Sequence, residues 1–204
     1  MNEKILSQSE KIYTAEEYLK MERRRANRHE FSNGKIMATA GSTRRHNLIC
    51  TNTIIAVGSR LRGHKCEIYA NDMRVRLSAS RFCYPDVAVV SGEPAFADNE
   101  YDVLLNPAVV VEILSNADGQ SGKTEKLESY LAMDSVRECL LVKEEDMRVE
   151  HYSKQNAKQW IFRIYNDRED IITLESIGCK VSLAEIYAQV RFGQAAEVNS
   201  QSVN

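Results

Sequence analysis

The segment Val109-Val-Val-Glu-Ile-Leu114 decides the fold, because it is apolar on both of the faces that a strand presents. Such a strand lies inside a sheet that is covered on both sides. A loop, a helical stretch over about 121–133 and a second apolar strand over 139–142 follow it. Strand, helix and strand in this order form a crossover unit, so we expect the two strands to pair in parallel.

Three local signals organise the first half of the chain. Thr14 and Glu17 form a capping box, which predicts a helix that continues to about residue 25. The dipeptide Asn33-Gly34 suits a two-residue turn with positive φ angles and therefore predicts a hairpin. A helical apolar period over 42–62 predicts a long helix, and Gly63 supplies a left-handed stop.

The rest of the chain is mostly strand-like, and a second capping box at Ser182 opens a short last helix. We expect an α+β fold in which helices flank a mixed central sheet, as one domain over residues 1–192. Residues 193–204 lack apolar periodicity and predict a disordered tail. The further strands are expected within 66–77, 87–90, 148–153, 159–165 and 171–175.

The composition is that of one soluble globular domain: 204 residues, 43% of them hydrophobic. No apolar run approaches the roughly 20 residues that span a bilayer, and the N-terminus lacks a signal-peptide core. The five cysteines are an odd number without a CxxC pair, which favours free thiols. We therefore expect a cytoplasmic protein that needs no membrane.

The charges are unevenly distributed along the chain. The net charge is -2, but residues 20–65 hold eleven basic and two acidic side chains, so this segment carries +9 and the remainder -11. A basic segment is either a solvated helix face or a surface that meets phosphates, and the sequence leaves both interpretations open.

Several enzyme classes lack their sequence signatures here. The chain has no GxxxxGK[ST] loop, no GxGxxG after a strand, no GxSxG and no HExxH, which disfavours NTPases, Rossmann dehydrogenases, α/β-hydrolases and zincins. The four histidines show no ligand-like spacing.

Two carboxylates stand beside buried strands. Asp86 begins the run 87–90, and Glu112 interrupts the apolar segment 109–114. A buried carboxylate must pair, protonate or bind a cation. Ion pairing or turn chemistry explains each acid alone, whereas together they suit a hard cation such as Mg²⁺ or Mn²⁺.

The helix that follows Glu112 adds cationic side chains. Lys123, Lys126 and Tyr130 are spaced so that they share one helix face. The preceding loop is short enough to fold that face over the end of the strand. Solvated lysines are the ordinary alternative for each residue taken alone.

An ordered set of motifs resembles the Uma-type family of restriction endonucleases, which belongs to the PD-(D/E)XK nuclease superfamily. The resemblance covers about residues 13–187. It rests on Tyr-Pro-Asp-Val-Ala-Val-Val at 84–90, Val-Val-Glu-Ile-Leu-Ser at 110–115, Lys-Thr-Glu-Lys-Leu-Glu-Ser-Tyr at 123–130, His-Glu-Phe-Ser-Asn-Gly at 29–34, His46, and Val-Arg-Glu-Cys-Leu-Leu-Val at 136–142.

The resemblance implies a restriction-endonuclease-like core and a metal-dependent endonuclease that acts on DNA. It makes Asp86 and Glu112 the ligands of Mg²⁺ or Mn²⁺. The superfamily lysine stands two residues after the acid, where this chain has Leu114, so the resemblance moves that role to Lys126. The resemblance further implies a catalytic role for Glu30 and makes His46 and Tyr130 candidate binding residues. The basic side chains of Lys123, Arg44 and Arg45 are additional candidates for binding the nucleic acid.

The sequence leaves two alternatives to the nuclease open. One is a cleavage-incompetent module on the same fold that binds nucleic acid or assembles with protein. The other is a structural homodimer whose late strands form the interface. We expect a homodimer in the nuclease case as well, while the choice between DNA and RNA stays open.

Overall fold

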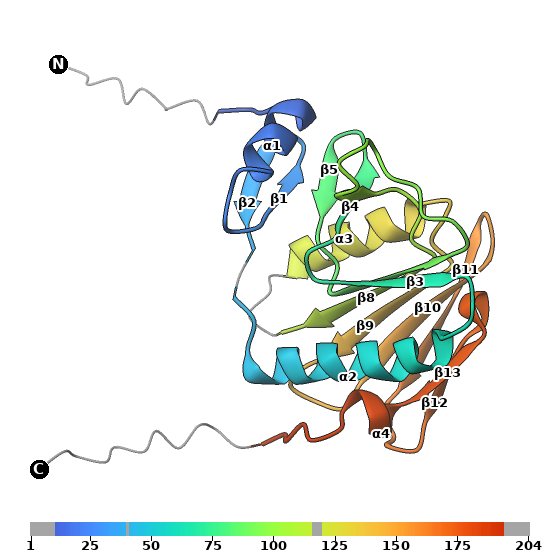
Figure 1. Cartoon of the computed structure of the whole chain (residues 1–204). Helices are drawn as coiled ribbons and strands as arrows, with labels where there is room; N and C mark the ends of the chain where they lie inside the picture. Colours follow the sequence, from blue (N-terminus) through green and yellow to red (C-terminus); the bar gives the residue numbers. More distant parts are fainter. Residues whose placement is uncertain (1–10, 40, 116–119, 194–204) are drawn as a thin grey trace, which may run out of the picture.

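The computed structural model describes residues 11–39, 41–115 and 120–193. Its centre is a six-stranded sheet in the order β11-β10-β9-β8-β6-β3 (Figure 1). The β8–β9 pair is parallel, as the crossover predicts, and its neighbours are antiparallel. The strands are β3 Cys66–Ala70, β6 Val87–Ser91, β8 Val109–Leu114, β9 Glu138–Lys143, β10 Val149–Asn156 and β11 Gln159–Tyr165.

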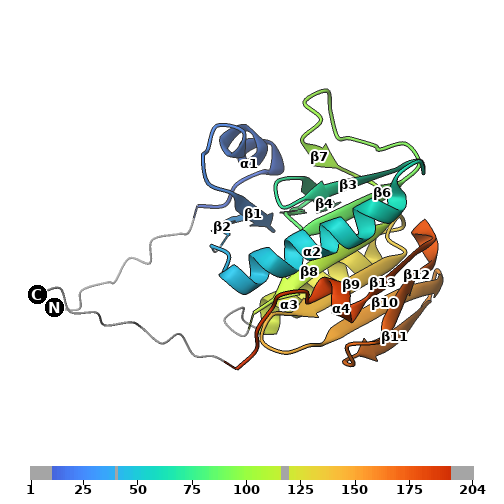
Figure 2. The same cartoon turned by 60° about the horizontal axis from the view of Figure 1, so that its bottom comes forward.

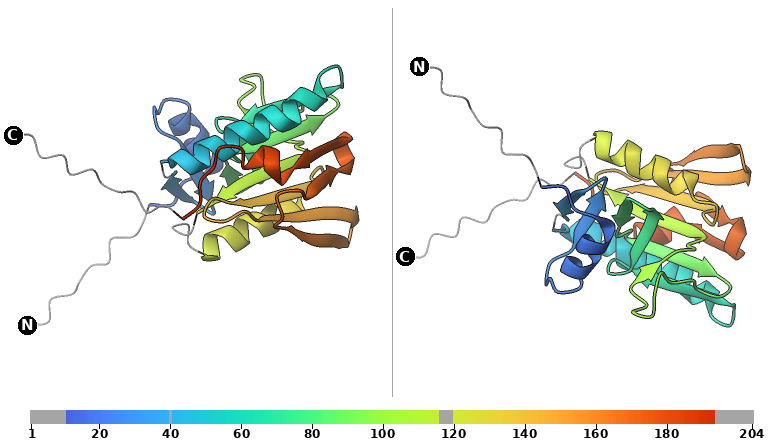
Figure 3. Two further views of the ribbon diagram at one scale, coloured as in Figure 1. Left: turned by 90° about the horizontal axis from the view of Figure 1, so that it is seen from below. Right: turned by 90° about the horizontal axis from the view of Figure 1, so that it is seen from above.

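Helices cover both faces of this sheet, which explains why β6 and β8 carry apolar residues on both of their faces. Helix α2 (Arg44–Leu61) packs on one face and α3 (Gln120–Ala132) on the other (Figure 3). The small sheet of β12 (Ile171–Leu174) and β13 (Cys179–Ser182) lies on the α2 side. The 3-10 helix η1 (Glu175–Ile177) and α4 (Leu183–Ile186) complete that layer.

A second sheet carries the N-terminal hairpin. Its order is β2-β1-β5-β4-β7, and α1 (Ala15–Glu22) packs against it through Tyr18, Phe31 and Phe82. Figure 2 shows α1 and the hairpin at the end of the molecule where α2 begins. The strands are β1 His29–Ser32, β2 Lys35–Ala38, β4 Arg74–Ser78, β5 Arg81–Cys83 and β7 Val103–Leu104.

The local sequence signals have the predicted consequences. Asn33 and Gly34 have φ angles of 49° and 88° and join β1 to β2, because Asn and Gly tolerate positive φ. The capping boxes at Thr14 and Ser182 are both formed. Gly63, with φ 83°, follows the end of α2.

The segment 66–77 is not the continuous strand that its sequence predicts. A turn at Asn71 and Asp72 divides it into β3, which joins the six-stranded sheet, and β4, which joins the other. Apolar side chains at 73, 75 and 77 alternate with Arg74 and Arg76 in the sequence, which predicts that Arg74 faces solvent, but Arg74 is buried. Its Nε donates to the hydroxyl of Tyr84 at 2.9 Å, and this tertiary partner makes the burial possible.

The sequence did not predict the short strands β5, β7 and β13. They are too short to show a hydrophobic period of their own, and pairing with other strands defines them. All five cysteines are free thiols, as expected. Within the described residues no helix is long and apolar enough to cross a membrane. The predicted tail lies, from residue 194 on, outside the described residues.

Candidate active site

Four segments that are distant in sequence converge at the carboxyl end of β8. In Figure 1 this strand end lies beside the first turns of α2 and α3 and below the β1–β2 hairpin. The segments contribute Glu30 from β1, Asp86 ahead of β6, Glu112 from β8 and Lys126 from α3. The site therefore combines three carboxylates with one ammonium.

Asp86 is fixed between strand and helix by two hydrogen bonds. Its Oδ2 accepts from the backbone N–H of Ile113 at 2.7 Å, which ties it to the strand next to β6. Its Oδ1 lies 3.1 Å from Nε2 of His46 on α2. The side chain thus does more than end a turn after Pro85, and its carboxylate is held beside that of Glu112.

Glu112 is buried in the middle of the sheet yet has two polar partners. The hydroxyl of Tyr130 donates to its Oε1 at 2.5 Å, and Nζ of Lys126 lies 3.1 Å from its Oε2. The pKa of Glu112 is raised to about 7, mainly by burial and further by the charges of Asp86 and Glu30, while Lys126 and Tyr130 oppose the rise. The positive charge of Lys126 is therefore too small to offset burial and the negative charges next to the ionised Glu112 carboxylate.

Lys126 bridges two acids. Its Nζ lies 2.8 Å from Oε1 of Glu30 and 3.0 Å from Oε1 of Glu112. Burial alone would lower the pKa of this lysine, but the charges of Glu112 and Glu30 hold it well above its ordinary value. Lys126 is therefore a permanent cation placed among the carboxylates, while the same Glu30 oxygen also accepts from the backbone N–H of Tyr84 at 3.3 Å.

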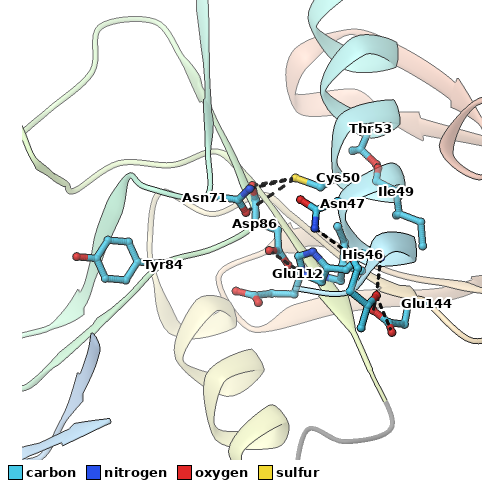
Figure 4. Close-up of polar contacts among 12 residues, drawn as sticks. His46, Asn47, Ile49, Cys50, Thr53, Asn71, Tyr84, Asp86, Glu112 and Glu144 are labelled. Carbon is cyan, nitrogen blue, oxygen red and sulfur yellow. Dashed lines mark hydrogen bonds and ion pairs between the residues drawn. The ribbon is translucent and has the colours of Figure 1, made fainter. Parts of the chain in front are cut away.

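His46 on α2 and a further acid, Glu144, lie near Asp86 and Glu112 (Figure 4), and Thr43 makes hydrogen bonds to both His46 and Glu144. Burial disfavours the charged imidazole, yet the hydrogen bond and charge of Asp86, with the charges of Glu144 and Glu112, raise its pKa. Its Nδ1 is buried and lacks a hydrogen-bond partner among the described residues. The hydroxyl of Thr43 lies 3.1 and 3.2 Å from the carboxylate oxygens of Glu144.

Glu144 and Thr43 are site residues that the sequence prediction missed. Glu144 directly follows β9 and is buried, while Thr43 caps α2 and accepts a hydrogen bond from the backbone of His46. The available signal was an acid at the end of a strand parallel to the Glu112 strand, because parallel neighbours end at the same sheet edge.

The remaining predicted residues differ in their placement. Tyr130 is buried and contacts Glu112, as just described. Arg44 is exposed and Arg45 partly buried in the first turn of α2, at the site end of that helix. Lys123 lies on α3, but its side chain lies outside the described residues.

The basic segment 20–65 is not one continuous cationic surface. Arg23 pairs with Asp98 and Asp102, and Arg60 pairs with Glu185. Arg44 and Arg60 stand near opposite ends of an 18-residue helix, which is about 27 Å long. The solvated and paired interpretation holds for part of the segment, while Arg44 and Arg45 stand next to the site.

The donor chemistry suits a divalent cation only in part. Asp86 and Glu112 offer the oxygen ligands that Mg²⁺ and Mn²⁺ prefer. The described residues contain no group of three or more His, Cys, Asp or Glu side chains that could hold a metal ion. A cation at this place would therefore rest on two protein carboxylates, with its other ligands from water or substrate.

Two proteins of Synechocystis are similar to this chain in sequence. An uncharacterized protein of Synechocystis, sll1609, is 34% identical over 152 residues, which are 74% of this chain and 86% of that protein. A second one, slr1290, is 26% identical over 178 residues, which are 87% and 92% of the two chains.

The fold also has a solved counterpart. A crystal structure from Anabaena variabilis, described as a putative nuclease belonging to DUF820, matches with a TM-score of 0.69 at 16% identity, over 86% of this chain and 97% of that one. The family model Uma2, described as "Putative restriction endonuclease", matches residues 15–184. The chain therefore belongs to the Uma2 family and has a restriction-endonuclease-like fold.

Proposed function

We propose that this protein is a Mg²⁺- or Mn²⁺-dependent endonuclease that hydrolyses phosphodiester bonds of DNA. One observation carries the proposal: Lys126 lies within 3.1 Å of Glu112, and the backbone N–H of the next residue, Ile113, donates a hydrogen bond to Asp86. Paired carboxylates next to an ammonium meet the needs of phosphodiester hydrolysis, where negative charge gathers on phosphoryl oxygens. Family membership supports the same reaction class.

Asp86 and Glu112 are the proposed metal ligands. A divalent cation, when bound, supplies Lewis acidity toward the phosphodiester. The raised pKa of Glu112 supports this assignment, because a cation would relieve the repulsion from Asp86 and Glu30 that contributes to it. His46 keeps Asp86 oriented through the contact between Nε2 and Oδ1.

Lys126 is the proposed electrostatic group of the reaction. Its high pKa keeps it charged over the working range of an enzyme, so it stabilises negative charge without a proton transfer. Glu30 holds the Lys126 ammonium from the other side. Arg44, Arg45 and Lys123 are proposed contacts to DNA phosphates, because they lie on the first turns of the helices that border the site.

Cleavage of supercoiled plasmid in the presence and absence of Mn²⁺ tests the proposal. We expect Glu112→Gln, Asp86→Asn and Lys126→Ala each to lower the rate by a factor of about 100 or more, the scale of one lost electrostatic contact in the transition state. The matched controls are Glu128→Gln and Lys158→Ala, whose side chains are exposed outside the site. Circular dichroism verifies the fold of each variant.

A cleavage-incompetent module is the second candidate, and Leu114 in the usual lysine position favours it. Salt-sensitive DNA binding by a wild-type chain that shows neither cleavage nor a Mn²⁺-induced thermal shift would favour this module over the nuclease. Full activity of any of the three site variants would contradict the nuclease assignment itself.

We further propose that the protein works as a cytoplasmic homodimer. Its five free thiols are typical of a reducing compartment. For the dimer, the support is the edge strand β11, which exposes Phe162 and Ile164. An apolar edge strand of this length is a template for pairing with a second chain.

A further inference from the structure

A polar pocket of about 970 Å³ lies away from the candidate active site. Its walls come from the beginning of β9, the inner face of the β10–β11 hairpin, and the segment from β12 to η1. Glu138, His151 and Ser153 are buried in its wall. Its size falls within the roughly 300–1,000 Å³ of small-molecule sites.

Buried polar atoms without partners gather in this pocket. Among the described residues, two such side-chain atoms belong to pocket residues, namely Oγ of Ser135 and Nδ1 of His151. Nε2 of His151 lies 3.3 Å from Oε1 of Glu138, an ion-pair distance. Nδ1 has no partner. A buried polar group without a hydrogen-bond partner is unfavourable, so two of them in one pocket indicate that another molecule completes the contacts.

The neighbouring carboxylate determines what His151 can offer. Glu138 accepts hydrogen bonds from the backbone N–H groups of Glu175 and Ser176 and from the hydroxyl of Ser176. Burial would raise the pKa of Glu138, but the hydrogen bonds from His151 and Ser176 lower it, so it is an acceptor only. The ring proton of a neutral His151 therefore belongs on Nε2, which leaves Nδ1 as an acceptor for a ligand hydroxyl or amino group.

Two arginines at the pocket can donate hydrogen bonds to a ligand, whereas Nδ1 of His151 can accept one. Arg137 is exposed, and no ion pair or side-chain hydrogen bond is recorded for it within the described residues. Arg163 is exposed as well, and its Nη1 donates to Oγ of Ser153 at 3.3 Å. Lys154 and Glu175, which also line the pocket, offset each other in charge. Arginine forks match the oxygens of a phosphate group.

We propose that this pocket binds a small phosphorylated molecule that also carries hydroxyl or amino donors. A mononucleotide and a sugar phosphate share this chemistry. The phosphate pairs with Arg137 and Arg163, a ligand donor meets Nδ1 of His151, and the hydroxyl of Ser135 gains its missing partner.

The pocket is separate from the nuclease site, so the proposal does not rest on the proposed function. Glu138 and Glu112 lie on neighbouring strands, and Glu138 pairs with Val109, three residues before Glu112. Three residues of strand span about 10 Å. The two side chains also lie on opposite faces of the sheet. Glu112 pairs with Leu141, which belongs to the core on the α3 side together with Cys139. Glu138 directly precedes Cys139 on β9, so its side chain points to the other face.

Isothermal titration calorimetry on the full chain in EDTA tests the proposal with AMP, ribose 5-phosphate and inorganic phosphate. We expect at least one ester to bind more tightly than inorganic phosphate. Arg137→Ala and Arg163→Ala should each lower the affinity for that ester about tenfold, because each removes one charge-assisted hydrogen bond. The control Arg62→Ala, at an exposed arginine beyond α2, should leave binding unchanged.

Amide chemical-shift changes in a ¹H–¹⁵N spectrum locate the bound ester. Changes at Ser135, His151 and Ser153 support the proposal, and the tighter of the two esters identifies the source of the ligand. Three results would overturn it: no binding of either ester, binding that survives both arginine variants, or shifts confined to the surroundings of Asp86 and Glu112. Equal affinity for inorganic phosphate would overturn the role of His151.

Discussion

The hydroxyl of Tyr130 lies between the Glu112 carboxylate and the Cys83 thiol. It donates to Glu112 at 2.5 Å, and the Cys83 thiol lies 3.1 Å away on its other side. Burial keeps the phenol neutral, since the pKa of Tyr130 is raised well above its ordinary value. The hydrogen bond therefore stabilises the ionised form of Glu112 and opposes the effect of burial on that carboxylate.

Removal of this hydroxyl by Tyr130→Phe should raise the pKa of Glu112 above its value of about 7, because the carboxylate loses a donor while remaining buried. A carboxyl-carbon NMR titration of the metal-free protein measures the change. Tyr152→Phe is the control, since no hydrogen bond is recorded for that hydroxyl among the described residues. An unchanged or lower pKa in Tyr130→Phe would contradict the role of the hydrogen bond.

At the scale of elements, the β1–β2 hairpin positions Glu30 against Lys126. Its turn depends on Gly34, whose φ of 88° is unfavourable for other residues. A Cβ at this position would lie 2.5 Å from a methyl carbon of Ile12. The accuracy of the Glu30–Lys126 contact therefore depends on a glycine outside the site.

Gly34→Ala should lower the free energy of unfolding by about 1–2 kcal/mol, because the left-handed conformation penalises the added Cβ. Urea denaturation measures the loss. Gly41→Ala is the matched control, since its Cβ would meet nothing within 4 Å and its φ is not positive. A change within about 0.5 kcal/mol is expected there. Equal stability of the two variants would show that the hairpin turn relaxes freely.

The edge strand β11 is the element on which the proposed homodimer depends. Phe162 and Ile164 are 49% and 44% exposed on it, and its described pairing partner is β10 alone. Two copies can add these edges antiparallel around a two-fold axis, which makes the contact self-complementary.

Phe162→Glu should convert the dimer to a monomer, because it places like charges next to each other at the two-fold contact. Light scattering after size exclusion measures the mass. Ile55→Glu, at a side chain 63% exposed on α2, should leave the dimer intact. A wild-type monomer at micromolar concentration would refute the dimer, and a Phe162→Glu dimer would refute this interface.

At the scale of the whole molecule, the charge distribution determines how a polyanion can approach. Ion pairs neutralise Arg23 and Arg60, whereas Arg44 and Arg45 remain at the site end of α2. Arg62 lies beyond the opposite end of the helix. The remainder of the chain carries net negative charge. DNA binding should therefore be weak and directed to the site end.

Arg44→Ala and Arg45→Ala should each weaken DNA binding and reduce the slope of log K against log salt by about one unit, because one phosphate contact releases about one counterion. Fluorescence anisotropy at several salt concentrations measures the slope. Arg62→Ala should leave it unchanged, given the length of α2. Equal effects of all three variants would indicate nonspecific binding over the whole surface.

Much of the fold follows from local sequence. The apolar runs predicted β6 and β8, the crossover predicted the parallel β8–β9 pair, and Asn33-Gly34 predicted the hairpin. The sequence missed the division of 66–77 and the burial of Arg74, because both depend on partners in other strands. Of the candidate site, the sequence predicted the strand acids, because Asp86 begins and Glu112 interrupts an apolar run. It did not predict Glu144, because this acid lies among other polar residues.

The sequence by itself determined the elements whose cause is local: capping hydroxyls, positive φ at a turn, and apolar residues on both faces of a strand. Only the tertiary structure brought together Glu30, Asp86, Glu112 and Lys126 from four segments. It also decided which arginines are neutralised and that Nδ1 of His151 is buried without a hydrogen-bond partner among the described residues. The physical reason is that ion pairs and buried hydrogen bonds depend on distances across the fold, which no local pattern encodes.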